Sequence, residues 1–228
     1  MKKNCKNILF YNRNEAARQL MEVLPLKEMK KDKWVVIALS PGGFVIANEI
    51  AKRTKLSIDL LFNEAIAAPL NPNCEIARVS ETEEIVIHDI LADSFRIKND
   101  YIFGEAKRQY EDHILPDIFS YRKDSTFCTL QGRHVLLVDE GCETGLKMMV
   151  GIKSALERGA TSVYATSPVM PDNLALTLRR LADDVFPIHE VDDYILTSSY
   201  YDEFEEVTEK ILHAIFDEMI VNNKEHNE

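Results

Sequence analysis

HVLLVDEGCETGLKMM, residues 134–149, is the stretch that decides the fold. Four apolar residues, Val135 to Val138, run directly into two acids, Asp139 and Glu140. A loop with two glycines and a threonine follows, and helical spacing of apolar residues begins at Leu146. The pattern predicts a buried strand, a tight loop and a helix over 146–158 with Met149, Ile152 and Leu156 facing inward, and it places two carboxylates at the end of the strand.

The same order of elements occurs near the start of the chain. Residues 34–39 form a continuous apolar run, the loop Ser40-Pro41-Gly42-Gly43 follows, and helical spacing begins at Phe44. Further alternation predicts strands at 58–62, 162–166 and 184–188, and helices at about 12–24, 172–182 and 203–221. Strands that alternate with helices indicate an α/β fold, a parallel sheet flanked by helices, which we expect to be one domain spanning residues 1–228.

Residues 63 to about 132 break this alternation. Residues 68–73 contain two prolines and two asparagines, which predicts a turn, and residues 84–88 predict a short strand. A charged helical stretch from 99 to about 123 contains Pro116, where we expect an interruption. We interpret the segment as an inserted hood over the main sheet.

The composition excludes several classes of protein. The net charge is 27 − 38 = −11, so nucleic acid is not expected as a partner, because phosphate backbones need a basic surface. No apolar run is long enough to cross a membrane. The four cysteines (Cys5, Cys74, Cys128, Cys142) lack the close spacing of a zinc or redox site. We interpret them as free thiols of a cytoplasmic protein.

The loop after Val138 suits a ligand with two chemical faces. Ligands of open parallel sheets bind beyond the carboxyl ends of the strands, where Asp139 and Glu140 lie. The amides at the start of the next helix favour an anion. The loop is not a Walker A motif, because Gly141 and Gly145 are separated by three residues instead of four. A Gly-x-Gly-x-x-Gly dinucleotide motif is also absent from the sequence.

The strand, the two acids and the Thr144-Gly145 loop resemble the phosphoribosyl pyrophosphate motif of type I phosphoribosyltransferases. Segment 39–43 is similar to the pyrophosphate loop of that family. Three later segments (68–72 with 77–79, 168–171 and 200–204) resemble a bacterial subfamily of predicted phosphoribosyltransferases. The match therefore covers most of the chain, at five places in the right order.

The resemblance implies a role for each of these residues. Asp139 and Glu140 are expected to hold the ribose hydroxyls and to stabilise positive charge at C1. The 5-phosphate is expected on the loop Gly141, Cys142, Glu143, Thr144, Gly145, Leu146 and Lys147, and pyrophosphate on Ser40, Pro41, Gly42 and Gly43. Tyr194 and Tyr201 lie where the family covers the base. Mg²⁺ is expected to be carried by the substrate, with no metal site on the protein, and relatives are often homodimers.

Three departures from the family pattern fall where phosphate is handled. Pro41 stands where the pyrophosphate loop usually has Arg or Lys, and Asn63 and Glu64 stand where the subfamily has a basic residue. Lys147 replaces the threonine that closes the 5-phosphate loop. Two hypotheses follow: an active phosphoribosyltransferase of narrowed or unusual substrate, or a catalytically impaired relative that binds a phosphoribosyl compound or nucleotide as a regulatory module. A basic residue of the hood that reaches the pyrophosphate site, such as Arg78, would favour the first.

Simpler interpretations remain open for individual residues. Asp139 and Glu140 are consistent with a strand that ends in solvent, and Gly42-Gly43 with a plain turn. Lys147 is consistent with a solvated side chain, although a cation at a helix start is unfavourable without a nearby anion. Either tyrosine is consistent with core packing.

Overall fold

The structure is a computed structural model that describes residues 8–123 and 125–225. The thiol predicted at Cys5 lies outside these residues. Cys74, Cys128 and Cys142 are free. Within the described residues, no helix is long and apolar enough to cross a bilayer.

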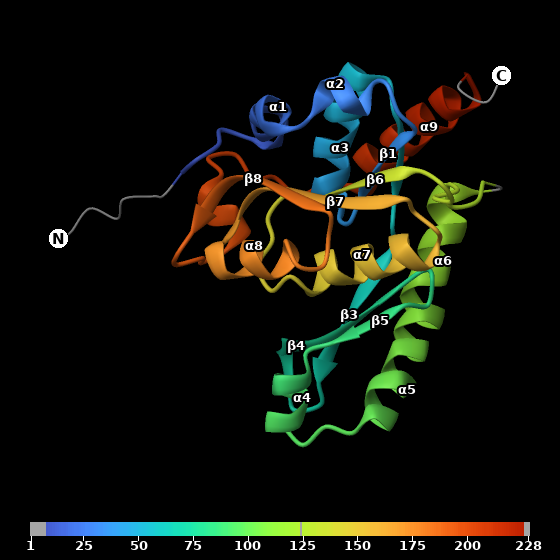
Figure 1. Ribbon diagram of the computed structural model, residues 1–228. Coiled ribbons are helices and arrows are strands. Elements are labelled where there is room, and N and C mark those ends of the chain that lie inside the picture. Colours follow the sequence, from blue (N-terminus) through green and yellow to red (C-terminus); the bar gives the residue numbers. More distant parts are fainter. Residues whose placement is uncertain (1–7, 124, 226–228) are drawn as a thin grey trace.

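Five parallel strands form the central sheet, in the spatial order β2-β1-β6-β7-β8 (Figure 1). They are β1 (Trp34–Ala38), β2 (Ser57–Leu60), β6 (His134–Val138), β7 (Ser162–Pro171) and β8 (Asp184–Val191). Strands β1 and β6 are neighbours, with Ala38 opposite Val138. The residues that follow these two strands therefore meet at one edge of the sheet.

Helices cover both faces of the sheet, which confirms the predicted fold class (Figure 1). One face is covered by α1 (Arg13–Val23), α3 (Pro41–Thr54) and α9 (Glu209–Glu225), with the short α2 (Leu26–Met29) nearby. The other face is covered by α7 (Leu146–Glu157) and α8 (Asp172–Leu178). Each face has its own buried apolar cluster, so the sheet is buried on both sides, as is usual for parallel sheets.

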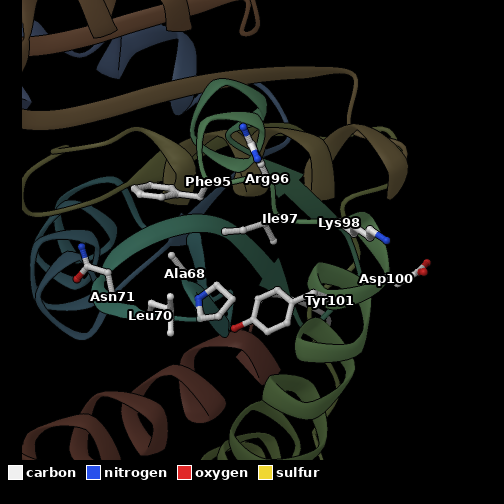
Figure 2. A pocket seen from close by; sticks show the side chains of 10 residues that line it. Ala68, Leu70, Asn71, Phe95, Arg96, Ile97, Lys98, Asp100 and Tyr101 are labelled. Carbon is white, nitrogen blue, oxygen red and sulfur yellow. The ribbon is translucent and has the colours of Figure 1, made fainter.

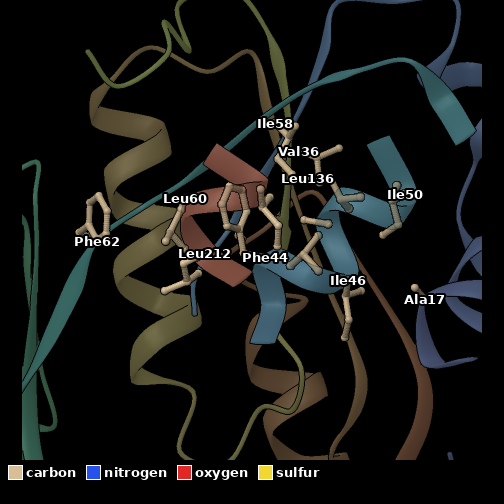
Figure 3. Close-up of a cluster of buried hydrophobic side chains, with 14 of the residues drawn as sticks. Ala17, Val36, Phe44, Ile46, Ile50, Ile58, Leu60, Phe62, Leu136 and Leu212 are labelled. Atoms are coloured by element: carbon tan, nitrogen blue, oxygen red, sulfur yellow. The ribbon is translucent and has the colours of Figure 1, made fainter. Parts of the chain in front are cut away.

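The larger cluster joins α3, α9 and the edge of the sheet (Figure 3). Phe216 of α9 packs against Phe44 and Phe62, with ring centroids 5.0 and 6.0 Å away. Leu60 and Leu212 lie in the same cluster. Burial of each such side chain contributes roughly 1.5–3 kcal/mol.

The segment interpreted as a hood forms its own antiparallel sheet (Figure 1). Its elements are β3 (Asn63–Ala68), β4 (Asn71–Ser80), β5 (Ile85–Ile87), α4 (Asp89–Ser94) and α5 (Asn99–Gln109). The sheet lies against α7, where Ser80 Oγ is 2.8 Å from Ser154 Oγ. The chain therefore leaves β2, builds this sheet and returns to β6.

The expected turn over 68–73 is wrong in part, and strands β3 and β4 were missed. Only residues 69–70 form the turn, because β4 already begins at Asn71. Pro72 is tolerated at this exposed strand start, where its missing N–H is not needed. The alanine-rich β3 has weak strand propensity, and pairing with β4 overrides it.

The expected interruption at Pro116 is also wrong, because the chain stays helical from α5 to Arg122. Two π-helical segments, Tyr110–Ile114 and Ile118–Arg122, flank the short α6 (Leu115–Asp117). Proline cannot donate a hydrogen bond to the preceding turn. The wider π turns on either side let the helix pass it.

Other helix limits differ from the predictions for local reasons. Helix α3 begins at Pro41 and not at Phe44, because Ser40 Oγ accepts from Gly43 N and caps it. The last helix begins at Glu209, since Asp202 N and Glu203 N bind the carbonyls of residues 10 and 11 and hold the chain extended. Leu156, expected to face inward, is 51% exposed, and Ala155 is buried instead.

A buried charge network joins the hood to the sheet. Arg122 is 1% exposed, donates to both Glu81 carboxylate oxygens, and lies 3.2 Å from Asp59 Oδ1. Its guanidinium also lies over the rings of Phe62 and Phe127. Burial raises the pKa of Asp59 and of Glu81, which Arg122 opposes. One arginine thus compensates two carboxylates from different parts of the chain.

We predict that Arg122→Gln destabilises the fold by about 3–5 kcal/mol, because it leaves buried carboxylates uncompensated. Urea unfolding measures this loss, with the exposed Arg108→Gln as control, for which we expect less than about 1 kcal/mol. A buried carboxyl with a raised pKa keeps its proton longer in the folded state. The loss of stability in Arg122→Gln should therefore grow as pH rises above the ordinary pKa values of the two carboxyls, 3.8 and 4.5. A pH-independent loss would contradict this account.

Candidate active site

The turns after β1 and β6 are joined by a buried hydrogen bond. Ser40 Oγ donates to Asp139 Oδ1 at 2.5 Å while it accepts from Gly43 N at 3.0 Å. One hydroxyl thus caps α3 and fixes the first of the two acids. The sequence-predicted pyrophosphate residues and the predicted ribose acids therefore lie together.

Gly42 and Gly43 lie in the first turn of α3, so the predicted glycine loop is in fact helical. Close packing against backbone requires glycine at Gly43, and the present position of the Glu140 side chain leaves no room for a Cβ at Gly42. A Cβ on Gly43 would lie 2.7 Å from Val138 O and 3.0 Å from Asp139 Cα. A Cβ on Gly42 would overlap the Glu140 carboxylate. The absence of side chains here lets α3 approach the end of β6.

Asp139 is buried and paired with a cation. Its side chain is 3% exposed, and Lys147 Nζ lies 3.1 Å from Oδ2. Lys147 is the residue expected to contact the 5-phosphate, and its ammonium lies between α7 and the acid. Lys147 therefore compensates the negative charge of Asp139 and also lies at the end of the predicted 5-phosphate loop.

Glu140 is paired with Arg13, a residue that the sequence did not single out. Arg13 Nε donates to Glu140 Oε2 at 2.5 Å, and the guanidinium lies 4.1 Å from the centre of the Phe204 ring. Burial raises the pKa of Glu140, and the charge of Arg13 opposes that shift. The backbone of Glu140 is held by Tyr201, whose hydroxyl donates to its carbonyl at 2.6 Å.

The loop from Gly141 to Lys147 leads into the start of α7. Gly145 has φ 81° and precedes Leu146, whose N–H is 3.4 Å from Thr144 Oγ1. The other amides of the first helical turn have no partner inside the helix and carry the positive end of its dipole. Glu143 and Thr144 are exposed, so an anion can reach this turn.

Cys142 does not take part in anion binding by its amide, which donates to Val169 O at 3.1 Å. Its side chain is 2% exposed, and burial raises the pKa of the thiol to about 12. A thiol that stays protonated is a poor nucleophile. Cys142 therefore packs the loop against β7.

The two tyrosines expected to cover a base lie in different environments. Tyr194 is half-buried beside Gly141, with its hydroxyl 2.8 Å from Thr197 Oγ1. Tyr201 is 4% exposed and packs between the rings of Phe10 and Phe204. Tyr194 is thus partly exposed near the loop, whereas Tyr201 is buried in the core and holds the backbone of Glu140.

A cavity of about 450 Å³ lies beside the first turn of α3. Leu39, Ser40 and Pro41 form one wall, and four acids from other segments share its lining (Glu64, Asp117, Glu206, Glu209). Burial raises the pKa of Glu64 and of Asp117. The four acidic side chains that share this lining disfavour a free anion on this side of the site.

Arg78, considered as a replacement cation, is engaged within the hood. It donates to Asn63 Oδ1 at 2.7 Å and to Glu75 Oε1 at 2.6 Å. Asn63 Nδ2 in turn donates to Leu39 O at 2.9 Å. The guanidinium is therefore linked to the turn after β1 through one amide side chain.

A second hollow, of about 620 Å³, lies in the hood (Figure 2). Phe95, Ile97, Leu70 and Tyr101 surround it, and the Tyr101 hydroxyl donates to Ala67 O. None of its lining residues comes from the turns after β1 or β6. It is separate from the candidate site.

Comparison with known proteins agrees with the motif analysis. No family model matches the chain. Two curated proteins of Mycobacterium tuberculosis strains, each named "Putative phosphoribosyl transferase", are 25% identical over 181 residues, 78% of this chain. The chain spans only 39% of the length of these relatives. The crystal structure of TT1426 from Thermus thermophilus matches with a TM-score of 0.76 and 28% identity, covering 93% of this chain and 99% of that one.

The chain resembles phosphoribosyltransferases. The resemblance stated from the motifs is confirmed by the names of these relatives, and the α/β fold fits it. Because this chain spans only 39% of the length of these relatives, its activity is proposed from its own residues.

The structure brings most of the predicted site residues to one sheet edge and adds two features that were missed. Ser40, Gly42 and Gly43 meet Asp139 and Glu140 directly. Arg13 was missed, although it lies in the first turn of α1, where a cation opposes the helix dipole. That mismatch signals a nearby anion, as it did for Lys147. The positioning role of the Tyr201 hydroxyl had no comparable sequence signal.

Protein ligands for a metal are few at this site. Among the side chains that the structure describes, no group of three or more His, Cys, Asp or Glu residues is arranged to hold a metal ion. Asp139 already uses both carboxylate oxygens, for Ser40 and Lys147. Mg²⁺ carried by the substrate is therefore kept as an expectation of the resemblance.

We predict that Gly43→Ala costs about 1–3 kcal/mol of stability, because its Cβ meets backbone at Val138 and cannot be accommodated by a side-chain rotation. Gly104→Ala in α5 is the matched control, since nothing lies within 4 Å of its added Cβ. There alanine should stabilise the helix by roughly 0.5–1 kcal/mol. Chemical unfolding of both variants measures the difference, and equal effects would show that packing at Gly43 is loose.

Proposed function

We propose that this protein binds 5-phosphoribosyl pyrophosphate and transfers its phosphoribosyl group to a nitrogenous base. The observation that supports this most is the junction of Ser40 with Asp139. It joins an acid pair, a helix start suited to a 5-phosphate and the residues predicted to meet pyrophosphate at one edge of the sheet. Separate anion sites on either side of a diol-binding pair match the chemistry of this ligand.

In the proposed reaction, the bond from ribose C1 to the pyrophosphate oxygen breaks and pyrophosphate leaves with the electron pair. A ring nitrogen of the base supplies the pair for the new C1–N bond and loses its proton to water or to the released pyrophosphate. Positive charge develops on the ribose between these events, and Asp139 and Glu140 stabilise it. Bound Mg²⁺ would neutralise charge on the leaving pyrophosphate.

The ion pairs define what must change when a ligand binds. Lys147 and Arg13 occupy carboxylate oxygens that ribose hydroxyls would need. Both cations can turn from the acids to phosphate groups of the same ligand, so the charges remain paired. Free ribose has no phosphate, so its binding would leave both cations without a new anionic partner.

We predict that the protein binds phosphoribosyl pyrophosphate with Mg²⁺ more tightly than ribose 5-phosphate in calorimetric titration. The pyrophosphate contacts are the reason for the difference. Asp139→Asn combined with Glu140→Gln should remove binding of both ligands, and Asp172→Asn, an exposed acid at the start of α8, is the control. Full affinity in the double variant would rule out the proposed ribose site. If pyrophosphate release then follows with a nucleobase, transfer is supported.

A second candidate function is nucleotide binding without transfer. The acids of the 450 Å³ cavity favour it, because Glu64 and Asp117 disfavour a highly charged leaving group at the side of Pro41. Equal affinity for ribose 5-phosphate and phosphoribosyl pyrophosphate would support this regulatory module over the transferase.

For Lys147 we predict a contact with the 5-phosphate. Loss of a charge-assisted hydrogen bond costs about 1.5–3 kcal/mol, so Lys147→Ala should weaken ribose 5-phosphate at least about tenfold. Competition by a nucleoside and its 5-monophosphate separates this effect from general damage to Asp139. Lys153→Ala on the same helix is the control, since its ammonium pairs with Glu84. If nucleoside and nucleotide are weakened equally, Lys147 acts only through the acid.

A further inference from the structure

Arg13 is held by three different groups at the edge of the candidate site. Its Nε donates to Glu140 Oε2, Nη1 donates to Glu205 O at 2.7 Å, and the guanidinium lies against the Phe204 ring. The side chain is 11% exposed. Such a fixed orientation restricts where the remaining N–H groups can point.

The contacts of Glu140 place this guanidinium beside the first turn of α3. Oε2, the oxygen that accepts from Arg13, is also the atom that a Cβ on Gly42 would overlap. Arg13 and the Gly42 backbone therefore approach the same carboxylate oxygen. This is the turn whose Pro41 supplies neither a positive side chain nor an N–H.

Arg13 retains donors for a further partner. A guanidinium has five N–H donors, and no described residue accepts from Nη2 of Arg13. Its planar fork matches the oxygens of a phosphate group. The nearby acids would repel a pyrophosphate that had no such cation beside it.

We propose that Arg13 binds the pyrophosphate group of the ligand, supplying from α1 the positive charge that Pro41 lacks. This inference rests on the proposed function. In the ligand-free structure the same charge compensates Glu140. When ribose hydroxyls reach Glu140, the guanidinium pairs with pyrophosphate oxygens instead. Arg13 then distinguishes a pyrophosphorylated ribose from ribose 5-phosphate.

The test compares two ligands in the same protein samples. Wild type, Arg13→Gln, Arg13→Lys and Arg18→Gln are titrated with phosphoribosyl pyrophosphate plus Mg²⁺ and with ribose 5-phosphate. Inorganic pyrophosphate serves as a competitor. Arg18 is an exposed arginine on the same helix and controls for net charge. The ratio of the two affinities is insensitive to a fraction of misfolded protein, so a partly destabilised variant remains informative.

We expect Arg13→Gln to weaken phosphoribosyl pyrophosphate and inorganic pyrophosphate about tenfold to a hundredfold, with ribose 5-phosphate changed less than about threefold. Arg13→Lys should recover part of the loss, and Arg18→Gln should match wild type. Equal weakening of both ligands in Arg13→Gln would overturn the assignment and leave Arg13 as a support of Glu140. Wild type that binds neither ligand would overturn the proposed function, and this inference with it.

Discussion

The parallel pairing of β1 with β6 is the constraint on which the site depends. With Ala38 opposite Val138, the chain leaves both strands at the same level. Ser40 then reaches Asp139, and α3 can start only if its first turn carries no side chains against β6. A slip of one residue in this register would separate the hydroxyl from the acid. The register of the two central strands therefore determines the geometry of the site.

Charge balance at the sheet edge follows from this geometry. Two acids that end one strand would repel each other, and burial makes their ionised forms costly. Each acid is compensated by a cation from a different element, Asp139 by Lys147 and Glu140 by Arg13. The arrangement is neutral as a set within a chain of net charge −11. These four charges thus balance one another locally on an acidic protein.

The sequence predicted the fold class because strand and helix periodicities alternate plainly on either side of residues 63–132. It also placed two acids at the end of a buried strand, because a strand that ends in two carboxylates before a Thr-Gly loop is a local pattern. The sequence did not predict contacts between residues far apart in the chain, such as that of Arg13 with Glu140, which are 127 residues apart. Prolines likewise indicated a turn at Pro72 and a helix break at Pro116, yet strand pairing and π-helical turns continue the chain there. Propensities describe single residues, whereas these outcomes depend on neighbours in space.

The buried position of Arg122 affects how the molecule unfolds. Its partners, Glu81 in the turn that follows β4 and Asp59 in β2, belong to the hood and the main sheet respectively. Separation of the two parts would remove Arg122 from Asp59 and leave this carboxylate without its cation. We therefore expect hydrogen exchange to be equally slow for core amides on both sides of this boundary, as in a single cooperative unit.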